Sequence, residues 1–280
     1  MTITENTIEV GTLKWFYREA IPNNDTHKPP VLFLHGLPSQ SYSWTEVMPQ
    51  LAESGLRAIA PDWIGSGFSD KPDTRRFAYT PEAFIKALSD LIAALNLEKV
   101  SLVVQGFLGS VGLQYALRSK EMIERLIILN TPLSTNAKLP WAMKQWALPL
   151  VGDMVTQDPL LVDRTLEGGS GFVISDERLS VYRKPFLKTS ATGRALLATI
   201  KNLKLAESMA ELESGLADFS KPTLIIWGSA DPWLSSADAE KLATKSNIEL
   251  IKLEEAKHYP QEHWSGEISQ IMVNFLRRQT

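Results

Sequence analysis

Two side chains that lie far apart in the sequence have the chemistry of a proton-transfer pair. Asp231 lies in the segment GSADPW that ends the apolar run 222–228, and His258 follows the last predicted strand, NIELIKLE. Because the carboxyl ends of parallel strands meet at one edge of a sheet, both side chains are expected there. An aspartate that holds one imidazole nitrogen leaves the other free to act as a general base. The sequence therefore predicts Asp231 as the acid and His258 as the base.

Each of these assignments has a competing interpretation. The Asp-Pro pair at 231–232 is also common in ordinary turns. His263 is a second candidate for the base, but it lies further along, near the expected start of the last helix. The order of the pair, with the acid before the histidine and both after a strand–turn–helix stretch at 101–113, favours the catalytic interpretation.

That stretch has the pattern of a strand, a sharp turn and a helix that together present a nucleophile. The nucleophile is expected directly after Gln105, where the chain has Gly106. Neither Gln105, Phe107 nor Leu108 is a nucleophile, so shifting the pattern by one residue does not supply one. Glycine adopts positive φ at no steric cost, so Gly106 is expected to keep the turn without an attacking atom. Leu108 stands where a small residue is usual, and it is expected to loosen the turn.

The loop HGLPSQSYSW, which begins at His35, supplies further candidates for a ligand site. The backbone N–H groups of Leu37 and Phe107 are predicted to form an oxyanion hole. The predicted substrate-binding residues are His35, Gly36, Trp44, Trp63, Trp141 and Trp233. Phe107 and Trp146 are further aromatic candidates, although for most of these aromatic residues a place in the ordinary core is the competing interpretation.

The order of the expected elements indicates an α/β fold with a mostly parallel, doubly wound sheet. Buried-strand patterns alternate with helical patterns, one of which is expected to begin at Thr80. From 133 to 216 the pattern is helical and no strand is expected, apart from a glycine-rich loop in EGGSGF, 167–172. The chain is therefore predicted to have a core formed by 1–132 and 217–280, with an inserted helical cap at 133–216.

Composition limits the classes of function. The 280 residues carry a net charge of -3, which provides no basic surface for nucleic acid. There is no cysteine, so neither a disulfide nor a thiolate ligand is possible. No apolar run approaches the ~20 residues of a membrane span, and a soluble cytoplasmic protein is expected. Neither a metal nor an organic cofactor is expected; the expected partner is a small apolar molecule, and the sequence leaves the oligomeric state open.

Four segments, HGLPSQSYSW, DWIGSGFSDKP, LVVQGFLGSVGL and GSADPW, resemble the haloalkane dehalogenase and epoxide hydrolase branch of the α/β-hydrolase superfamily. In dehalogenases the turn reads Gln-Asp-Trp-Gly-Gly. Here Gly106 replaces the attacking aspartate, Phe107 replaces the tryptophan that donates to halide, and Leu37 replaces a polar halide-binding residue. The resemblance thus implies the fold and a hydrolase ancestry, and it argues against dehalogenation. The Gln-Gly turn and TQDPL, 156–160, also resemble little-characterised cyanobacterial and chloroplast α/β-hydrolase-like proteins.

Three hypotheses follow for the activity. In the first, the chain is an enzyme that works without a covalent nucleophile, through the Asp231–His258 pair. In the second, it is a small-molecule-binding or scaffold protein on a hydrolase fold that has lost catalysis. In the third, a nucleophile comes from Ser39, Ser110 or Tyr259. Ser66, which lies between two glycines, follows the wrong strand and has no helix behind it.

Overall fold

A computed structural model of the chain describes residues 2–278. Met1, Gln279 and Thr280, which fall within the predicted core ranges, lie outside the described residues. The fold is built on one eight-stranded sheet with the order β1-β2-β4-β3-β5-β6-β7-β8. β1 pairs with β2, and β2 with β4, in antiparallel fashion, and the other neighbours are parallel. The strands are β1 (Ile3–Val10), β2 (Leu13–Ala20), β3 (Val31–Leu34), β4 (Ala58–Pro61), β5 (Val100–Gln105), β6 (Ile123–Leu129), β7 (Thr223–Gly228) and β8 (Ile248–Leu253).

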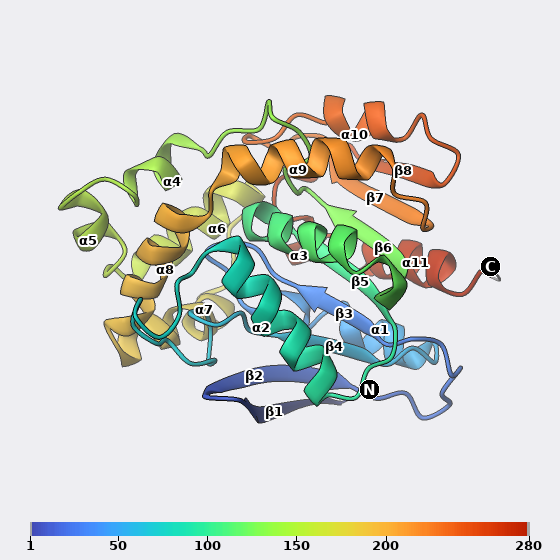
Figure 1. Cartoon of the computed structure of the whole chain (residues 1–280), viewed down its shortest axis with the longest axis horizontal. Coiled ribbons are helices and arrows are strands. Elements are labelled where there is room, and N and C mark those ends of the chain that lie inside the picture. The colour runs from blue at the N-terminus through green and yellow to red at the C-terminus, as the bar shows by residue number, and fades with distance from the viewer. Residues whose placement is uncertain (1, 279–280) are drawn as a thin grey trace.

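Helices cover both faces of this sheet (Figure 1). The α-helices are α1 (Met48–Glu53), α2 (Pro81–Ala94), α3 (Gly106–Arg118), α4 (Trp141–Gln145), α5 (Val151–Val155), α6 (Leu160–Ser170), α7 (Asp176–Lys188), α8 (Ala191–Asn202), α9 (Leu205–Ala217), α10 (Ala237–Leu242) and α11 (Ser265–Leu276). Short 3₁₀ helices lie at η1 (Ser41–Trp44), η2 (Lys120–Met122) and η3 (Pro260–Glu262). α2 and α3 pack on one face, and α1 and α11 pack on the other.

The central strands are apolar throughout because both of their faces are covered. In β5 every residue is buried, and alternate side chains enter different cores. Leu102 and Val104 pack with α2 and α3, whereas Val103 packs with α1 and α11. This arrangement fixes the carboxyl end of β5, where Gly106 lies, between two packed layers. The predicted α/β fold with a mostly parallel sheet is confirmed.

Local sequence signals account for one helix boundary and fail at another. Thr80 caps α2, accepting a hydrogen bond from the Ala83 N–H at 3.3 Å, as predicted. The glycine-rich loop predicted at 167–172 is wrong, because α6 continues through Gly168 and Gly169 to Ser170. The helix ends only at Gly171, whose φ of 72° is the left-handed conformation typical of a helix end.

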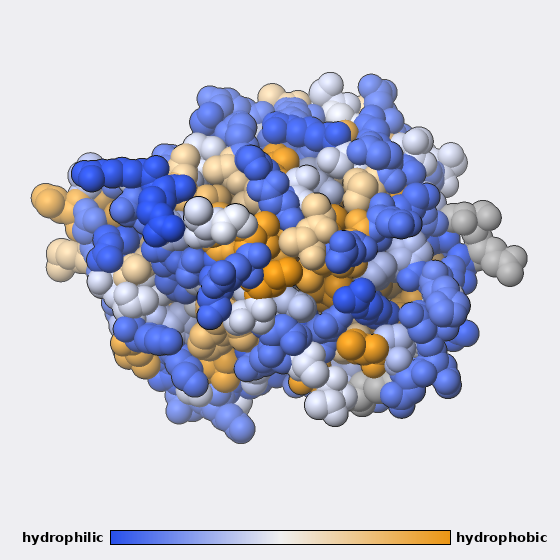
Figure 2. All heavy atoms as spheres, turned by 60° about the horizontal axis from the view of Figure 1, so that its bottom comes forward, coloured by the Kyte–Doolittle hydropathy of each residue, from blue (hydrophilic) through white to orange (hydrophobic). Residues whose placement is uncertain are grey.

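Helices α4 to α9 lie between β6 and β7, and no strand occurs in this segment, all of which the structure describes. Met143, Trp146 and Leu166 from these helices share one hydrophobic core with Val104 and Phe107. The division of the chain into a core and a separate cap therefore stays a prediction. The face in Figure 2 is mostly hydrophilic, with apolar side chains near its centre and at its left end, where α4 and α5 project in Figure 1.

Candidate active site

The turn between β5 and α3, residues 105–107 and called the elbow below, keeps the shape that presents a nucleophile. Gly106 has a φ of 69°, in the left-handed region. A Cβ atom placed on Gly106 would lie 3.5 Å from His258 Nε2, 3.9 Å from the Leu37 N and 3.2 Å from the Gly36 Cα. A side chain at this position would thus project between the imidazole and the predicted oxyanion-hole N–H of Leu37.

Leu108 does not loosen the turn, contrary to the sequence-based expectation. Its side chain is fully buried in the core. The close approach between helix and sheet is made one residue later, at Gly109, where a Cβ would come within 3.0 Å of Thr131 Oγ1. Gly112 repeats the approach one turn further, with a Cβ that would lie 2.7 Å from Val104 Cγ1. The elbow therefore has room for Leu108 because glycine occupies the crowded positions.

Asp231 and His258 are brought together as the sequence predicts, with 2.8 Å between Asp231 Oδ2 and His258 Nδ1. Both side chains are fully buried. Burial by itself raises the pKa of Asp231, but His258, the Trp233 N–H and the Asn130 amide together lower it below its ordinary value. Asp231 is therefore a carboxylate near neutral pH, suited to hold Nδ1 in the protonated form and leave Nε2 as an acceptor.

Asn130 is a site residue that the sequence interpretation missed. It directly follows β6, has a φ of 34°, and donates from Nδ2 to Asp231 Oδ2 at 2.8 Å. Its Oδ1 accepts the Gly228 N–H at 2.9 Å, which ties the end of β6 to the end of β7. A polar residue immediately after a buried strand was the signal; Asp231 lies in the loop that follows the neighbouring strand, β7.

Nε2 of His258 has no hydrogen-bond partner among the residues that the structure describes. The Phe107 ring stacks on the imidazole at 5.5 Å and the Trp233 ring lies 4.6 Å from it, centroid to centroid. The other candidate nucleophiles point elsewhere: Ser110 Oγ donates to the Phe107 carbonyl and Tyr259 Oη to the Leu37 carbonyl. Ser39 Oγ contacts the Gln40 carbonyl at 3.5 Å. None of the three supports the hypothesis of a relocated nucleophile.

His35 and Trp63, both predicted to bind substrate, instead join two loops of the scaffold. Trp63 donates from its backbone N to His35 Nε2 and from Nε1 to the His35 carbonyl, both at 3.1 Å. Burial lowers the pKa of His35, although Asp62 partly opposes this, so the ring stays neutral. Gly36 is needed for close packing, because a Cβ there would lie 2.6 Å from Gln105 Oε1.

Two further tryptophans predicted to bind substrate do not reach the elbow. Trp44 packs on Phe33 in the core on the opposite face of the sheet. Trp141 begins α4 with 72% of its side chain exposed. The prediction is wrong for these two because periodicity does not tell which face a residue covers. Of the predicted aromatic candidates, Trp233 and Phe107 contact the His258 ring.

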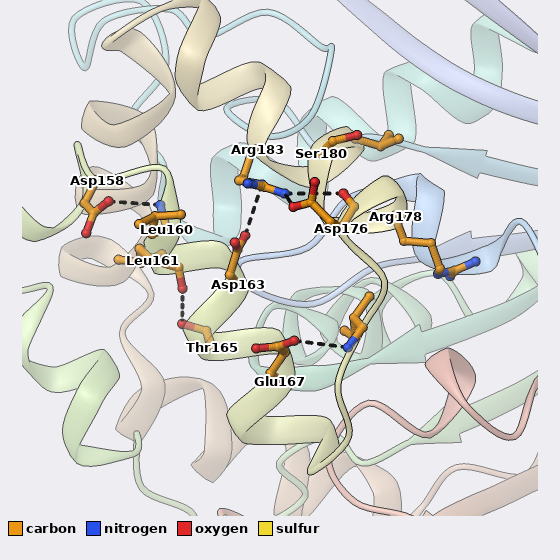
Figure 3. Close-up of polar contacts among 12 residues, drawn as sticks. Asp158, Leu160, Leu161, Asp163, Thr165, Glu167, Asp176, Arg178, Ser180 and Arg183 are labelled. Atoms are coloured by element: carbon orange, nitrogen blue, oxygen red, sulfur yellow. Dashed lines mark hydrogen bonds and ion pairs between the residues drawn. The ribbon is translucent and has the colours of Figure 1, made fainter.

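Helix α6 contacts the site through Gly169. The carbonyl of Gly169 accepts the His258 N–H at 2.9 Å, and a Cβ on Gly169 would lie 2.4 Å from Tyr259 and 2.6 Å from Trp233. Figure 3 shows how α6 is held to α7 and its preceding loop. Arg183 pairs with Asp163 at 3.5 Å and with Asp176, and Glu167 Oε1 accepts the N–H of Ile174 at 3.1 Å.

This contact predicts opposite effects for two neighbouring glycines. Gly169→Ala should destabilise the chain by about 1–3 kcal/mol, since its methyl group would overlap Tyr259 and Trp233. Gly168→Ala is the matched control, because a Cβ there meets nothing within 4 Å and alanine favours a helix by about 0.5–1 kcal/mol. Chemical denaturation of both variants measures the difference. Equal effects at the two positions would contradict the proposed packing.

A largely buried ionic cluster ties α7 to the segment after His258. Arg178 Nη2 pairs with Glu262 Oε2 at 2.9 Å, and Tyr182 Oη donates to Glu262 Oε1. Arg178 also pairs with Glu46 at 2.9 Å. Burial raises the pKa of Glu262, and Arg178 and the Tyr182 hydroxyl offset only part of this rise. The cluster closes α7 over the core beside His258.

Removal of the cation from this cluster should reduce stability in a pH-dependent way. Arg178→Met leaves the buried Glu262 without its ion pair, at a cost of about 3 kcal/mol. The folded-state pKa of Glu262, already raised, should rise further, so stability falls as pH rises through the range between the unfolded value of about 4.3 and that folded pKa. The loss of melting temperature should therefore be larger at pH ~8 than at pH ~5. Arg178→Met/Glu262→Gln should recover much of it, and Arg164→Met, which removes an ion pair with Asp158 on the surface, should have little effect.

Comparison with known proteins places this site in a family. The model of the alpha/beta hydrolase fold family matches residues 29–263. The chain belongs to this family. A cis-3-alkyl-4-alkyloxetan-2-one decarboxylase of Shewanella oneidensis is 30% identical over 74% of this chain and 69% of its own. A haloalkane dehalogenase of Bradyrhizobium diazoefficiens is 28% identical over 89% of this chain and 87% of its own.

Solved structures agree with the predicted branch of this α/β-hydrolase family. A haloalkane dehalogenase from Bradyrhizobium elkani superposes with a TM-score of 0.86 at 27% identity, covering 98% of both chains. An ancestral haloalkane dehalogenase gives 0.84 at 29% identity, covering 97% of this chain and 98% of its own. The predicted resemblance to the haloalkane dehalogenase branch is thereby confirmed, and the chain is of hydrolase ancestry.

The described residues, 2–278, form neither a membrane-spanning helix nor a cluster of metal ligands. No helix in that range has both the length and the apolar character needed to cross a membrane. No group of three or more His, Cys, Asp or Glu side chains within the same range is placed to hold a metal ion.

Proposed function

We propose that this α/β-hydrolase-fold protein is an enzyme that hydrolyses a small apolar ester or lactone by direct attack of water. The observation that carries the proposal is the unpartnered His258 Nε2, buried 3.5 Å from the Cβ position of Gly106 and backed by Asp231. The unpaired Nε2 therefore lies where it would accept a proton from a nucleophilic side chain at residue 106. Water in that place takes over the role of the side chain.

The proposed step needs no covalent intermediate. Nε2 of His258 accepts a proton from water as the water oxygen bonds to the carbonyl carbon. The carbonyl oxygen becomes negative and accepts hydrogen bonds from the backbone N–H groups of Leu37 and Phe107. The tetrahedral intermediate collapses as the C–O bond to the leaving group breaks, and His258 returns its proton to the leaving oxygen. Asp231 stabilises the imidazolium between the two transfers.

The surroundings support an apolar substrate with a carbonyl group. Phe107, Trp233 and Tyr259 surround the imidazole, and Leu133, Met143 and Trp146 belong to the same buried core. The relative from Shewanella oneidensis is named for an oxetan-2-one, a cyclic ester that bears two alkyl groups. Dehalogenation is not proposed, since Gly106 and Phe107 replace the attacking carboxylate and the halide donor that the resemblance implies.

A screen of apolar esters, β-lactones, epoxides and haloalkanes tests the proposal. The wild-type chain and Gly106→Asp are assayed side by side. Turnover of an ester or lactone by the wild type is the expected result. A wild type without activity towards esters and lactones, next to an active Gly106→Asp, would contradict the proposal, because the site would then lack only its nucleophile.

A binding or scaffold protein is the second candidate, favoured by one observation. The His258 imidazole is packed between Phe107 and Trp233 and is fully buried, as in a site closed to catalysis. A molecule that raises the melting temperature of the wild type without being converted would support this function over hydrolysis.

A further inference from the structure

Two cavities lie beside the acid–histidine pair, under the linker between β6 and α4. The inner cavity has a volume of about 230 Å³ and is lined by Leu133, Trp227, Trp233 and Leu234, among others. The outer cavity, of about 400 Å³, extends between α9 and α10. Leu133 and Asp238 line both cavities, so the two adjoin. Figure 1 shows the linker passing between α9 and α10 on its way from the sheet.

Several polar groups around these cavities have partners within the protein. Ser134 Oγ donates to Asp238 Oδ2 at 2.6 Å, and Thr135 Oγ1 donates to Glu213 Oε2 at 2.8 Å. Lys245 Nζ donates to the Leu216 carbonyl at 3.1 Å. The remaining walls are largely apolar: Leu133, Ala217, Trp227, Trp233, Leu234 and Leu242. Lys138 and Lys241 also line the cavities, but the carboxylates of Glu213 and Asp238 oppose their charge, so these largely apolar walls suit a molecule without net charge.

Trp233 separates the inner cavity from His258. Its side chain lines the cavity and is partly exposed, whereas the His258 ring, 4.6 Å away between centroids, is fully buried. The indole ring of Trp233 also packs on Gly169 of α6, and this glycine has no side chain that could hold the indole in place. One indole ring thus stands between a surface cavity and the base.

We propose that Trp233 is a gate and that the two cavities are the entrance for an uncharged molecule with an alkyl chain. This inference rests on the proposed function, because it names the route and the class of substrate for the same site. When the indole turns away, the cavity and the imidazole are joined, and the alkyl chain of the ligand lies along Leu133 and Leu234. When it returns, water outside is excluded from His258.

Chemical modification of histidines tests the gate without any need for turnover. Diethyl pyrocarbonate acylates accessible neutral imidazoles, and peptide mass spectrometry resolves the four histidines of the chain. His35, which is fully buried and bonded to Trp63, reports general loosening. In Trp233→Ala the modification rate of His258 relative to His35 should rise about tenfold or more. Trp141→Ala, which removes an exposed tryptophan, should leave this ratio unchanged. An unchanged ratio in Trp233→Ala, whether both rates rise or neither does, overturns the gate.

Two further measurements test the route and the ligand class. Leu133→Trp added to Trp233→Ala should fill the shared wall and return the ratio towards that of the wild type; a ratio that stays high places the entrance elsewhere. 2-Decanone, an uncharged chain that the proposed hydrolysis does not consume, should protect His258 in Trp233→Ala, and octanoate should protect it about fivefold less. Equal protection by the two would overturn the uncharged class. If the His258-to-His35 modification ratio rises in Trp233→Ala but the wild type turns over no ester or lactone, only the proposed function is contradicted. If the wild type does turn over such a substrate but the ratio is unchanged in Trp233→Ala, only the gate is contradicted.

Discussion

Gly106→Ser is expected to convert the elbow into a working serine nucleophile. A small sulfonyl fluoride should label the introduced serine at a rate about 10³-fold or more above any labelling of the wild type, since an activated serine supplies effects of this size or larger. The reason is geometric: the Cβ position at 106 lies 3.5 Å from His258 Nε2, which brings an attached Oγ within hydrogen-bond reach. The backbone N–H of Leu37 lies on the other side, placed for the developing oxyanion. Intact-mass and peptide measurements locate the adduct.

The controls separate reactivity from strain. Any side chain at residue 106 must adopt a φ near 69°, at a cost of about 1–3 kcal/mol. Gly106→Ala carries the same strain but no hydroxyl, so it should lose similar stability and remain unlabelled. Gly106→Ser/His258→Ala should label slowly, because the hydroxyl then lacks its base. If Gly106→Ser stays unreactive while its melting temperature matches that of Gly106→Ala, the elbow does not present residue 106 to His258 in solution.

The sequence predicts the elements of this site because each has a strong local signal. Apolar runs mark strands β3, β5, β6 and β7, and a polar or glycine residue marks the end of each strand. The family order of turn, acid and histidine then selects Asp231 and His258 from several candidates. A glycine at the turn is compatible with both a kept and a lost elbow, and only the φ of 69° distinguishes them.

The errors concern properties that depend on packing in three dimensions. Trp44 and Trp141 were predicted to bind substrate, but one lies on the far face of the sheet and the other on the surface. Gly168 and Gly169 were predicted to lie in a loop because two adjacent glycines weaken a helix. They are helical, and Gly169 lets α6 approach Tyr259 and Trp233. The two residues that require the glycine, Trp233 and Tyr259, lie 64 and 90 residues away in the sequence, where a local pattern carries no information about them.

The activity of this protein is harder to infer from its sequence than the fold is. Family relationship follows from residues spread over 29–263, whereas the chemistry depends on one position, Gly106. Loss of a nucleophile removes about 10⁶ in turnover from a serine protease, yet a residual acceleration of about 10³–10⁴ remains from binding and the oxyanion hole. An enzyme that uses water can build on that remaining acceleration if a base stays in place. Retention of the Asp231–His258 hydrogen bond, at 2.8 Å, is therefore the decisive feature of this chain.

His258→Ala in the wild-type background is accordingly expected to lower kcat on an ester or lactone identified by the screen by about 10²–10⁴, the range that general-base catalysis supplies. KM should change little, because the substrate is held mainly by the apolar walls and the imidazole acts in the transition state. Asp231→Asn should also lower kcat, since it removes the carboxylate that holds Nδ1.

A labelled-water experiment distinguishes direct attack from a covalent route. In a single turnover in H₂¹⁸O, direct attack by water places the heavy oxygen in the acid product. Attack by a side-chain carboxylate would leave the label on that residue if water then cleaves the anhydride at the carboxylate's own carbon. An acyl intermediate on any side chain would appear as an added mass on the protein in spectra of the quenched reaction. An unlabelled first product, an acyl adduct, or a kcat unaffected by His258→Ala would show that another group performs the attack. Label in the first product, no acyl adduct and loss of turnover in His258→Ala would together mean that water, activated by the buried imidazole, takes the place of the side chain that Gly106 lacks.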